Sequence, residues 1–144
     1  MATKKLHLKI VTPERVILEE DVDQVTLPTM EGEITVLPDH IPLISSLKSG
    51  DIVAVSGGEY VPMAVVGGFI EVKDNTVAVL ADYAEHVAEL SEEVVARAQA
   101  KAKELEAAKE RGEVVDFEHF ESELERSLTR AKIVDKWRTK KYRR

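Results

Sequence analysis

Apolar and polar residues alternate along the first half of the chain. Leu6, Leu8 and Ile10 are separated by polar residues, which is the period of two that a strand with one buried face requires. Further short apolar segments, bounded by glycine and proline, span residues 16–18, 24–27, 33–37 and 51–55. This spacing predicts a series of short strands rather than helices.

The clearest local prediction is a β-hairpin formed by residues 69–72 and 77–80. Asp74 and Asn75 lie at its centre, and both residue types tolerate the positive φ angles of a tight turn. The doublet Gly67-Gly68 precedes a strand pattern rather than a helix, which favours a bulge or a close backbone approach over a phosphate-binding loop. Together the strands predict an antiparallel β-sandwich or flattened barrel.

The pattern changes after Gly68, because the rest of the chain has no proline and one further glycine, Gly112. Ser91 is a suitable N-cap for a helix ending at Gly112, and Asp116 suits a second helix. Apolar stripes follow at helical spacing: Val94, Ala98, Ala102, Leu105 and Ala108, then Phe117, Phe120, Leu124, Leu128 and Ala131. The short connection predicts an antiparallel two-helix hairpin. We therefore expect a two-domain β + α chain, with the sandwich at 1–87 and the hairpin at 88–144.

The predicted hairpin is thinly packed and ends in a basic segment. Its first helix offers mostly alanine to the seam, and Lys101 intrudes there; a buried Leu or Val contributes roughly 1.5–3 kcal/mol and alanine much less. Residues 126–144 hold nine Lys or Arg against one acid, whereas residues 1–125 carry a charge of −15. This asymmetry indicates an acidic protein partner, a solvated terminus, or nucleic acid or anionic lipid. Trp137 either anchors an interface or extends the seam.

Candidate catalytic chemistry is absent from the sequence. The 144 residues include no cysteine, and four histidines, His7, His40, His86 and His119, are spaced unlike metal ligands. There is no phosphate-loop, dinucleotide or nucleophile-elbow motif. The longest apolar run, residues 63–70, is far shorter than the about 20 residues of a membrane-spanning helix. We expect no metal, no cofactor and no catalysis by this chain alone.

Three segments resemble the epsilon subunit of F-type ATP synthases. They are Glu31-Gly32-Glu33-Ile34-Thr35-Val36-Leu37-Pro38-Asp39-His40-Ile41-Pro42-Leu43, then Leu47-Lys48-Ser49-Gly50, and then residues 67–72 continuing through 75–82. The resemblance is strong over residues 5–86 and looser over the helices. It implies a non-catalytic central-stalk subunit of a proton-translocating F-type ATP synthase, which couples rotation of the c ring to the catalytic hexamer.

The resemblance also implies where the partners bind. The loop at Glu31, Gly32 and Glu33 is expected to face the c ring, and His40 is expected near the gamma subunit. An equally weighted interpretation of His40 is that the residues around it simply form a tight turn. Association with the membrane would then run only through the complex, with no nucleic acid involved.

For the hairpin, the resemblance implies two positions. In bacterial members it lies folded on the sandwich or extends into the catalytic hexamer and hinders ATP hydrolysis. Our hypothesis is that the extended form pairs basic side chains with acidic segments of the catalytic alpha and beta subunits. These side chains are Arg126, Arg130, Lys132 and Lys136. Arg126 and Arg130 lie on the side of their helix away from the apolar stripe.

Some bacterial members bind ATP at the hairpin, and this chain matches their motif only in part. Glu85, Arg126 and Arg130 match, but Ser91, Val94 and Val95 stand where that motif has Asp, Arg and Ala. Loss of the arginine removes a donor that could grip a phosphate in bidentate fashion. We therefore expect weak or no nucleotide binding.

Two alternatives remain open on the sequence alone. One is a soluble β-sandwich adaptor whose basic hairpin recruits an acidic protein, and the other is a small-ligand sensor or enzyme that uses the sandwich cleft. Absence of a transit peptide favours a bacterial protein, peripheral on the cytoplasmic face of the cell membrane.

Overall fold

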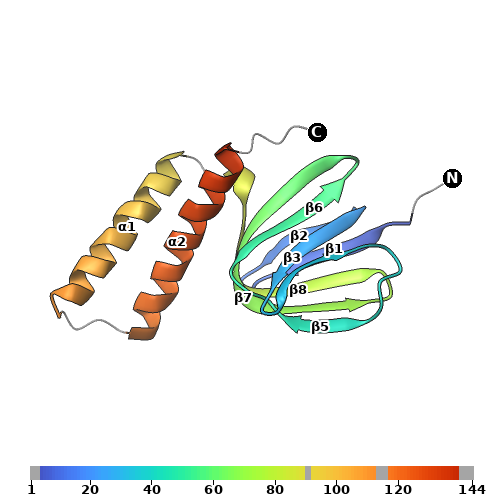
Figure 1. The fold of residues 1–144 in the computed structure, drawn as a ribbon, viewed down its shortest axis with the longest axis horizontal. Coiled ribbons are helices and arrows are strands. Elements are labelled where there is room, and N and C mark those ends of the chain that lie inside the picture. The colour runs from blue at the N-terminus through green and yellow to red at the C-terminus, as the bar shows by residue number, and fades with distance from the viewer. Residues whose placement is uncertain (1–3, 90–91, 113–116, 140–144) are drawn as a thin grey trace.

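The computed structural model describes residues 4–89, 92–112 and 117–139. A β-sandwich forms one end of the molecule and two helices lie side by side at the other end (Figure 1). The strands are β1 (Leu6–Val11), β2 (Val16–Val22), β3 (Gln24–Thr29), β4 (Gly32–Val36), β5 (Leu43–Ser46), β6 (Gly50–Ser56), β7 (Glu59–Lys73) and β8 (Thr76–His86). A short 3₁₀ turn, η1 (Val87–Glu89), leads to α1 (Glu92–Glu110) and α2 (Phe117–Thr139). The predicted order of a sandwich followed by a helical hairpin is confirmed.

The strands of the described chain pair in the order β2-β1-β8-β7-β6-β3-β4, and β5 pairs with β7. All these pairs are antiparallel except β1 with β8, which is parallel from His7↔Thr76 to Val11↔Leu80. The predicted antiparallel sandwich is confirmed apart from this one parallel pair. Its two strands are far apart in sequence, so no turn fixes their relative direction.

The sandwich encloses one apolar core. Leu6, Leu8 and Ile10 are fully buried, as their alternation predicts, and they join side chains from the other strands in a single cluster. The cluster draws only on residues between Leu6 and Ala84. The core therefore belongs to the sandwich alone, and the helices pack outside it.

The β7–β8 hairpin forms as predicted. Asp74 and Asn75 have φ angles of 50° and 57°, and Lys73 pairs with Thr76 across the turn. Two successive positive φ angles define the type of turn that matches the twist of the flanking strands. The strands are longer than predicted, however, because β7 starts at Glu59 and β8 continues to His86.

At Gly68 the backbone of β8 lies so close to β7 that no side chain fits. A Cβ atom added to Gly68 would lie 2.0 Å from the carbonyl oxygen of Leu80, and its φ of +110° disfavours any other residue. The interpretation of this doublet as a close backbone approach is confirmed. β5 is a strand that the sequence pattern did not reveal.

The helices form the predicted hairpin, but their contacts differ from the predicted seam. Gly112 adopts a φ of +70° after α1, and its N–H donates to the carbonyl of Lys109 at 3.1 Å, as expected for a glycine cap. Ala102 is buried, but Leu128, predicted to lie in the seam, is 50% exposed. Leu128 instead lines the groove between α2 and the sandwich. Ser91 and Asp116, the predicted N-caps, lie outside the described residues.

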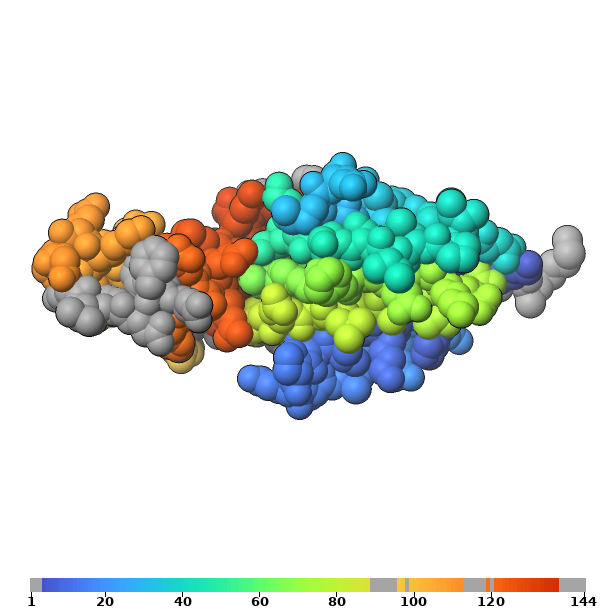
Figure 2. Space-filling model, turned by 90° about the horizontal axis from the view of Figure 1, so that it is seen from below, coloured from blue at the N-terminus to red at the C-terminus, as the bar shows by residue number. Residues whose placement is uncertain are grey.

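α2 lies between α1 and the sandwich, in both the ribbon and the space-filling view (Figures 1 and 2). It contacts α1 along its length and rests on β6, β7 and η1. The division of the chain into domains at 1–87 and 88–144 stays a prediction; β8 ends at His86, one residue before that boundary.

Candidate functional site

Arg130 joins α2 to the sandwich. Its Nε donates hydrogen bonds to the hydroxyl of Tyr83 at 2.7 Å and to Oε2 of Glu85 at 2.8 Å. The hydroxyl of Tyr83 also hydrogen-bonds Glu85. The guanidinium carbons of Arg126 and Arg130 lie 4.9 Å and 5.1 Å from the centre of the Tyr83 ring, within cation–π range. Two cations that would repel each other in an isolated helix thus share one aromatic ring.

Partial burial and hydrogen bonding shift the pKa values of Tyr83 and Arg130 in this cluster. Burial, followed by the hydrogen bond to Glu85, raises the pKa of Tyr83 to about 12, so the phenol is neutral at physiological pH. Burial opposes the charge of Arg130, but its hydrogen bonds to Tyr83 and Glu85 and the charge of Glu85 outweigh burial and raise the Arg130 pKa. The side chain of Glu85 therefore faces a permanent cation.

A cavity of about 260 Å³ opens beside this cluster, between the two helices and β8. It is lined by Tyr83, Arg97, Lys101, Glu123, Arg126, Ser127 and Arg130. Lys101, which intrudes on the predicted seam, donates to Glu123 at 3.0 Å and so finds a partner there. Glu85, Arg126 and Arg130, which match the nucleotide motif, do come together, whereas Ser91 and the side chains of Val94 and Val95 lie outside the described part of the chain.

A second contact joins the end of α2 to β6. Nζ of Lys136 and Nε1 of Trp137 donate to the same oxygen, Oδ2 of Asp51, at 2.8 Å and 3.0 Å. Beside it, Ile133 and Trp137 are buried against Ala64, with Val53 and Val87 packed around them. Trp137 therefore anchors an interface with the sandwich. Asp51 carried no signal in the sequence, because 85 residues separate it from Lys136.

The four basic residues predicted to act on a partner have different surroundings. Arg130 and Lys136 are ion-paired with the sandwich, and Arg126 lies over Tyr83. Lys132 is exposed and lines a larger groove, of about 720 Å³, between α2 and the tips of β3, β4 and β6. These residues thus lie along one helix, but the sandwich already engages most of them.

The predicted c-ring loop is the exposed turn between β3 and β4. Glu31, Gly32 and Glu33 are all exposed, and Gly32 has a φ of +123°. The hydroxyl of Thr29 braces the turn by accepting a hydrogen bond from the N–H of Glu31 at 3.2 Å. The loop therefore presents two carboxylates from a fixed backbone at the tip of the sandwich.

His40 follows a tight turn, as one of its two interpretations states. Asp39 has a φ of 65°, and its N–H donates to Oδ1 of Asn75 at 2.5 Å. Hydrogen bonds from Lys4 and then Asn75 lower the pKa of Asp39. Nδ1 of His40 hydrogen-bonds the carbonyl of Ile41 at 2.6 Å. The turn exists, while the placement of His40 near a partner stays a prediction.

An exposed apolar strip crosses the outer face of β5, β7 and β8. Its members are Ile44, Phe69 and Leu80, which are 75%, 59% and 55% exposed. Phe69 pairs directly with Leu80 and with Ser46, two residues from Ile44, so all three side chains share one face. Sequence reasoning missed this strip. The signal in the sequence was two pairs of adjacent apolar residues, Phe69-Ile70 and Val79-Leu80. Because successive side chains of a strand point to opposite faces, one residue of each pair must face outward.

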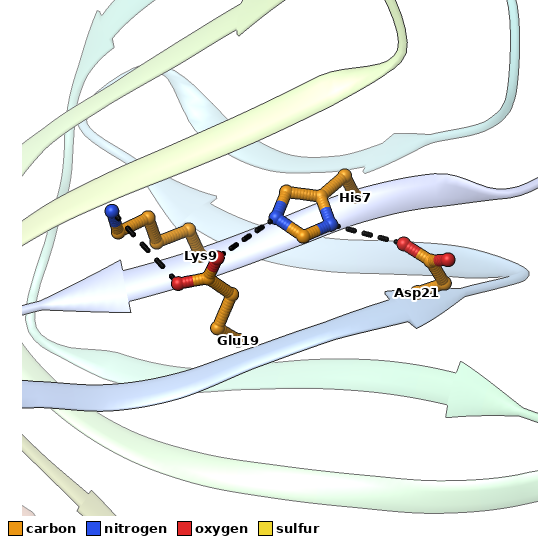
Figure 3. Close-up of polar contacts among 4 residues, drawn as sticks. All are labelled: His7, Lys9, Glu19 and Asp21. Atoms are coloured by element: carbon orange, nitrogen blue, oxygen red, sulfur yellow. Dashed lines mark hydrogen bonds and ion pairs between the residues drawn. The ribbon is translucent and has the colours of Figure 1, made fainter.

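A cross-strand charge cluster covers the outer face of β1 and β2 (Figure 3). Nδ1 of His7 contacts Asp21 at 3.0 Å, Nε2 contacts Glu19 at 3.3 Å, and Lys9 lies 3.8 Å from Glu19. The hydrogen bond to Asp21, followed by that to Glu19, raises the pKa of His7. In the part of the chain that the structure describes, no group of His, Asp and Glu has the arrangement of a metal site.

Comparisons with known proteins agree with this architecture. Residues 5–87 match the family model "ATP synthase, Delta/Epsilon chain, beta-sandwich domain". The chain is 36% identical to the ATP synthase epsilon chain of Desulforamulus reducens over 92% of its own length and 98% of that protein. It is 40% identical to the epsilon chain of Nitratidesulfovibrio vulgaris, over 90% and 96% of the two chains.

The fold is also found in a solved structure. A chain of the Euglena gracilis mitochondrial ATP synthase superimposes with a TM-score of 0.63 at 24% identity, covering 96% of this chain and 82% of that one. The protein described here belongs to the ATP synthase delta/epsilon chain family. Within that family, it is similar over nearly its whole length to proteins named ATP synthase epsilon chain. The resemblance found in the sequence is confirmed, and neither the adaptor nor the ligand-sensor alternative accounts for it.

Proposed function

We propose that the chain works as a non-catalytic subunit in the rotor stalk of an F-type ATP synthase. The observation that carries this function is the similarity to epsilon chains across both the sandwich and the hairpin. The chain takes part in ATP synthesis through the complex and supplies no catalytic group of its own. No described helix is long and apolar enough to cross a bilayer.

The sandwich is the part that we propose binds the rotor. The apolar strip of Ile44, Phe69 and Leu80 suits a protein partner, because exposed apolar patches of this kind mark interaction sites. We assign the strip and His40 to the gamma subunit, and the loop at Glu31, Gly32 and Glu33 to the c ring. The rigid turn that presents the two carboxylates supports the second assignment.

The hairpin is the part that we propose inhibits ATP hydrolysis. Arg126, Arg130, Lys132 and Lys136 would pair with acidic segments of the catalytic alpha and beta subunits when the hairpin extends. In the folded position, Glu85 holds Arg130 and Asp51 holds Lys136. Inhibition therefore requires that these contacts open first, because α2 cannot lie against the sandwich and extend into the catalytic hexamer at the same time.

We propose that ATP is not a regulatory ligand of this hairpin. The cavity beside Tyr83 has cations for phosphate groups, but Ser91, Val94 and Val95 replace the residues expected at the start of the first helix. Isothermal titration of the full chain should therefore give no saturable heat at micromolar ATP. Saturable binding that Arg126→Gln abolishes would contradict this proposal.

We also propose that the complex places this chain on the cytoplasmic face of a bacterial cell membrane. Membership of a family of ATP synthase subunits supports a location in a membrane-bound complex. A fractionation should find the protein with the membranes and release it, together with the catalytic subunits, at low ionic strength with a chelator.

The experiment that tests the function measures ATP hydrolysis by the assembled catalytic complex with the full chain and with residues 1–87. The shorter chain keeps the whole core cluster, which ends at Ala84. We expect both chains to bind and the shorter one to raise hydrolysis several-fold. Failure of the full chain to bind would remove the proposed function, and equal hydrolysis would remove only the inhibitory part.

A further inference from the structure

The hairpin is attached to the sandwich by a small area. The sandwich core is one large cluster, whereas the described attachment site is a separate cluster of Ala64, Ile133 and Trp137. A segment held by few buried contacts opens at a lower free energy than the whole protein unfolds. The polar groups of the attachment site therefore have a large share in deciding whether α2 stays in place.

Asp51 lies at the centre of this attachment site. It pairs across the β6–β7 ladder with Ala64, the residue on which Ile133 and Trp137 pack. Its side chain is 11% exposed, and its Oδ2 accepts hydrogen bonds from both Lys136 and Trp137. One carboxylate thus binds the ammonium of Lys136 and the indole N–H of Trp137, next to the apolar contact of Ala64 with Ile133 and Trp137.

We propose that Asp51 is the latch that positions the hairpin on the sandwich. The carboxylate of Asp51 accepts the hydrogen bond of the buried Trp137 N–H. Loss of the whole carboxylate would leave that donor without this acceptor when α2 packs on the sandwich, which is unfavourable. Asp51→Asn keeps an acceptor oxygen, but it removes the ion pair with Lys136 and weakens the hydrogen bond from Trp137, so it should release the end of α2 while the strands remain folded.

The latch also competes with any partner that needs the same cation. Lys136 is ion-paired with Asp51 at 2.8 Å, so its ammonium is engaged as long as α2 is seated. Asp51 thus binds Lys136 as an acidic partner would, and this favours the position of the hairpin on the sandwich. The effect of this preference on hydrolysis rests on the proposed function; the latch itself does not.

Trp137 offers a direct readout, because it is the single tryptophan of the chain and is buried in the attachment site. In the full chain, we expect Asp51→Asn to raise the acrylamide quenching constant of this fluorescence at least twofold. Asp51→Glu should keep part of the protection. Lys132→Gln is the matched control, because it removes an exposed cation from the same helix and should leave quenching unchanged.

The melting temperature of the sandwich separates release from unfolding. Asp51→Asn should change quenching while the main thermal transition, followed by the circular dichroism of the strands, stays within a few degrees. Unchanged quenching in Asp51→Asn would overturn the latch, and so would an equal rise in Lys132→Gln.

Hydrolysis by the assembled complex then tests the consequence. Asp51→Asn should lower hydrolysis, since it frees the hairpin, whereas Lys132→Gln should raise it, since it removes a predicted partner contact. If quenching changes as expected but hydrolysis does not, the latch stands and the inhibitory function fails. If quenching is unchanged, the latch fails whatever hydrolysis shows.

Discussion

The sandwich and the helical hairpin are held together by different kinds of contact. The sandwich buries a continuous cluster of apolar side chains between Leu6 and Ala84, and hydrogen-bonded ladders join its strands. The described hairpin buries few large side chains, Ile133 and Trp137 among them, and is attached by charged groups such as Arg130 and Lys136.

Apolar burial therefore sets the stability of the sandwich, whereas ion pairs contribute to the position of the hairpin on it. Apolar burial is non-directional and does not depend on charges that salt can screen, so the sandwich keeps its shape under conditions that weaken ion pairs. Partly exposed ion pairs contribute little to stability and are screened by salt. The position of the hairpin therefore depends on interactions that solvent and binding partners can change. A docking module should have the first property and a regulatory arm the second.

The largest expected effect comes from truncating the core. Ile52→Ala should lower the free energy of unfolding by about 2–5 kcal/mol, because it removes a fully buried side chain and leaves a cavity. Ile133→Ala, its match in the hairpin, should instead increase quenching of Trp137 and leave the main transition nearly unchanged. Denaturant titrations of both variants measure this. Equal losses in the main transition would show that the two regions unfold as one unit.

The next effect concerns the apolar strip. Phe69→Asp should weaken binding to the rotor at least tenfold, about 1.4 kcal/mol, because it places a charge in the centre of the proposed interface. Stability should change little, since the side chain faces solvent. Val16→Asp, at an exposed position on β2 outside the strip, is the control. Pull-down with the gamma subunit distinguishes them, and equal binding of both variants would place the interface elsewhere.

A smaller effect concerns the closed position of the hairpin. The side chains of Ser49 and Glu125 hydrogen-bond across the junction, and the chain has no native cysteine. Joining Ser49→Cys and Glu125→Cys with a short thiol cross-linker should hold α2 on the sandwich and prevent inhibition of hydrolysis. Cleavage of the cross-link should restore inhibition. Full inhibition by the cross-linked protein would show that the hairpin acts without leaving the sandwich.

The smallest effect is a pH dependence that belongs to the sandwich alone. The pKa of His7 is raised in the folded protein, so its contribution to stability is complete below its unfolded pKa of about 6.5 and is lost as the pH rises through the folded value. Lys5 lowers the pKa of Asp23, and Lys4 lowers that of Asp39; the stability this contributes is present at neutral pH and is lost only as the pH falls through the folded values, so it adds no slope between pH 6 and 8. His7→Gln should therefore flatten the melting temperature between pH 6 and 8. An unchanged slope would exclude His7 as its source.

Local chemistry made several features predictable. The turn at Asp74 and Asn75 follows from the φ angles that these residues tolerate, and the buried face of β1 follows from its alternation. The motif around residues 31–43 indicated the family. Glu85, Arg126 and Arg130 were matched to one site from the sequence, and the structure brings them together.

Other features depend on pairings that no local pattern encodes. The exposure of Leu128 depends on how α2 divides its surface between α1 and the sandwich. The parallel direction of β1 beside β8 depends on a pairing between opposite ends of the domain. The apolar strip was visible only as adjacent apolar pairs, and the register decided which member faces solvent.

By itself, the sequence determined most of the elements, their order and the family of this protein, because periodicity, turn residues and motifs act over a few neighbouring positions. Only the tertiary structure decided that Asp51 meets Lys136 and Trp137 of α2 and that Trp137 is buried against Ala64. Such contacts join residues tens of positions apart. These contacts form only when particular faces of the helices and strands pack together. That packing depends on how the whole chain buries its apolar side chains, not on any single segment.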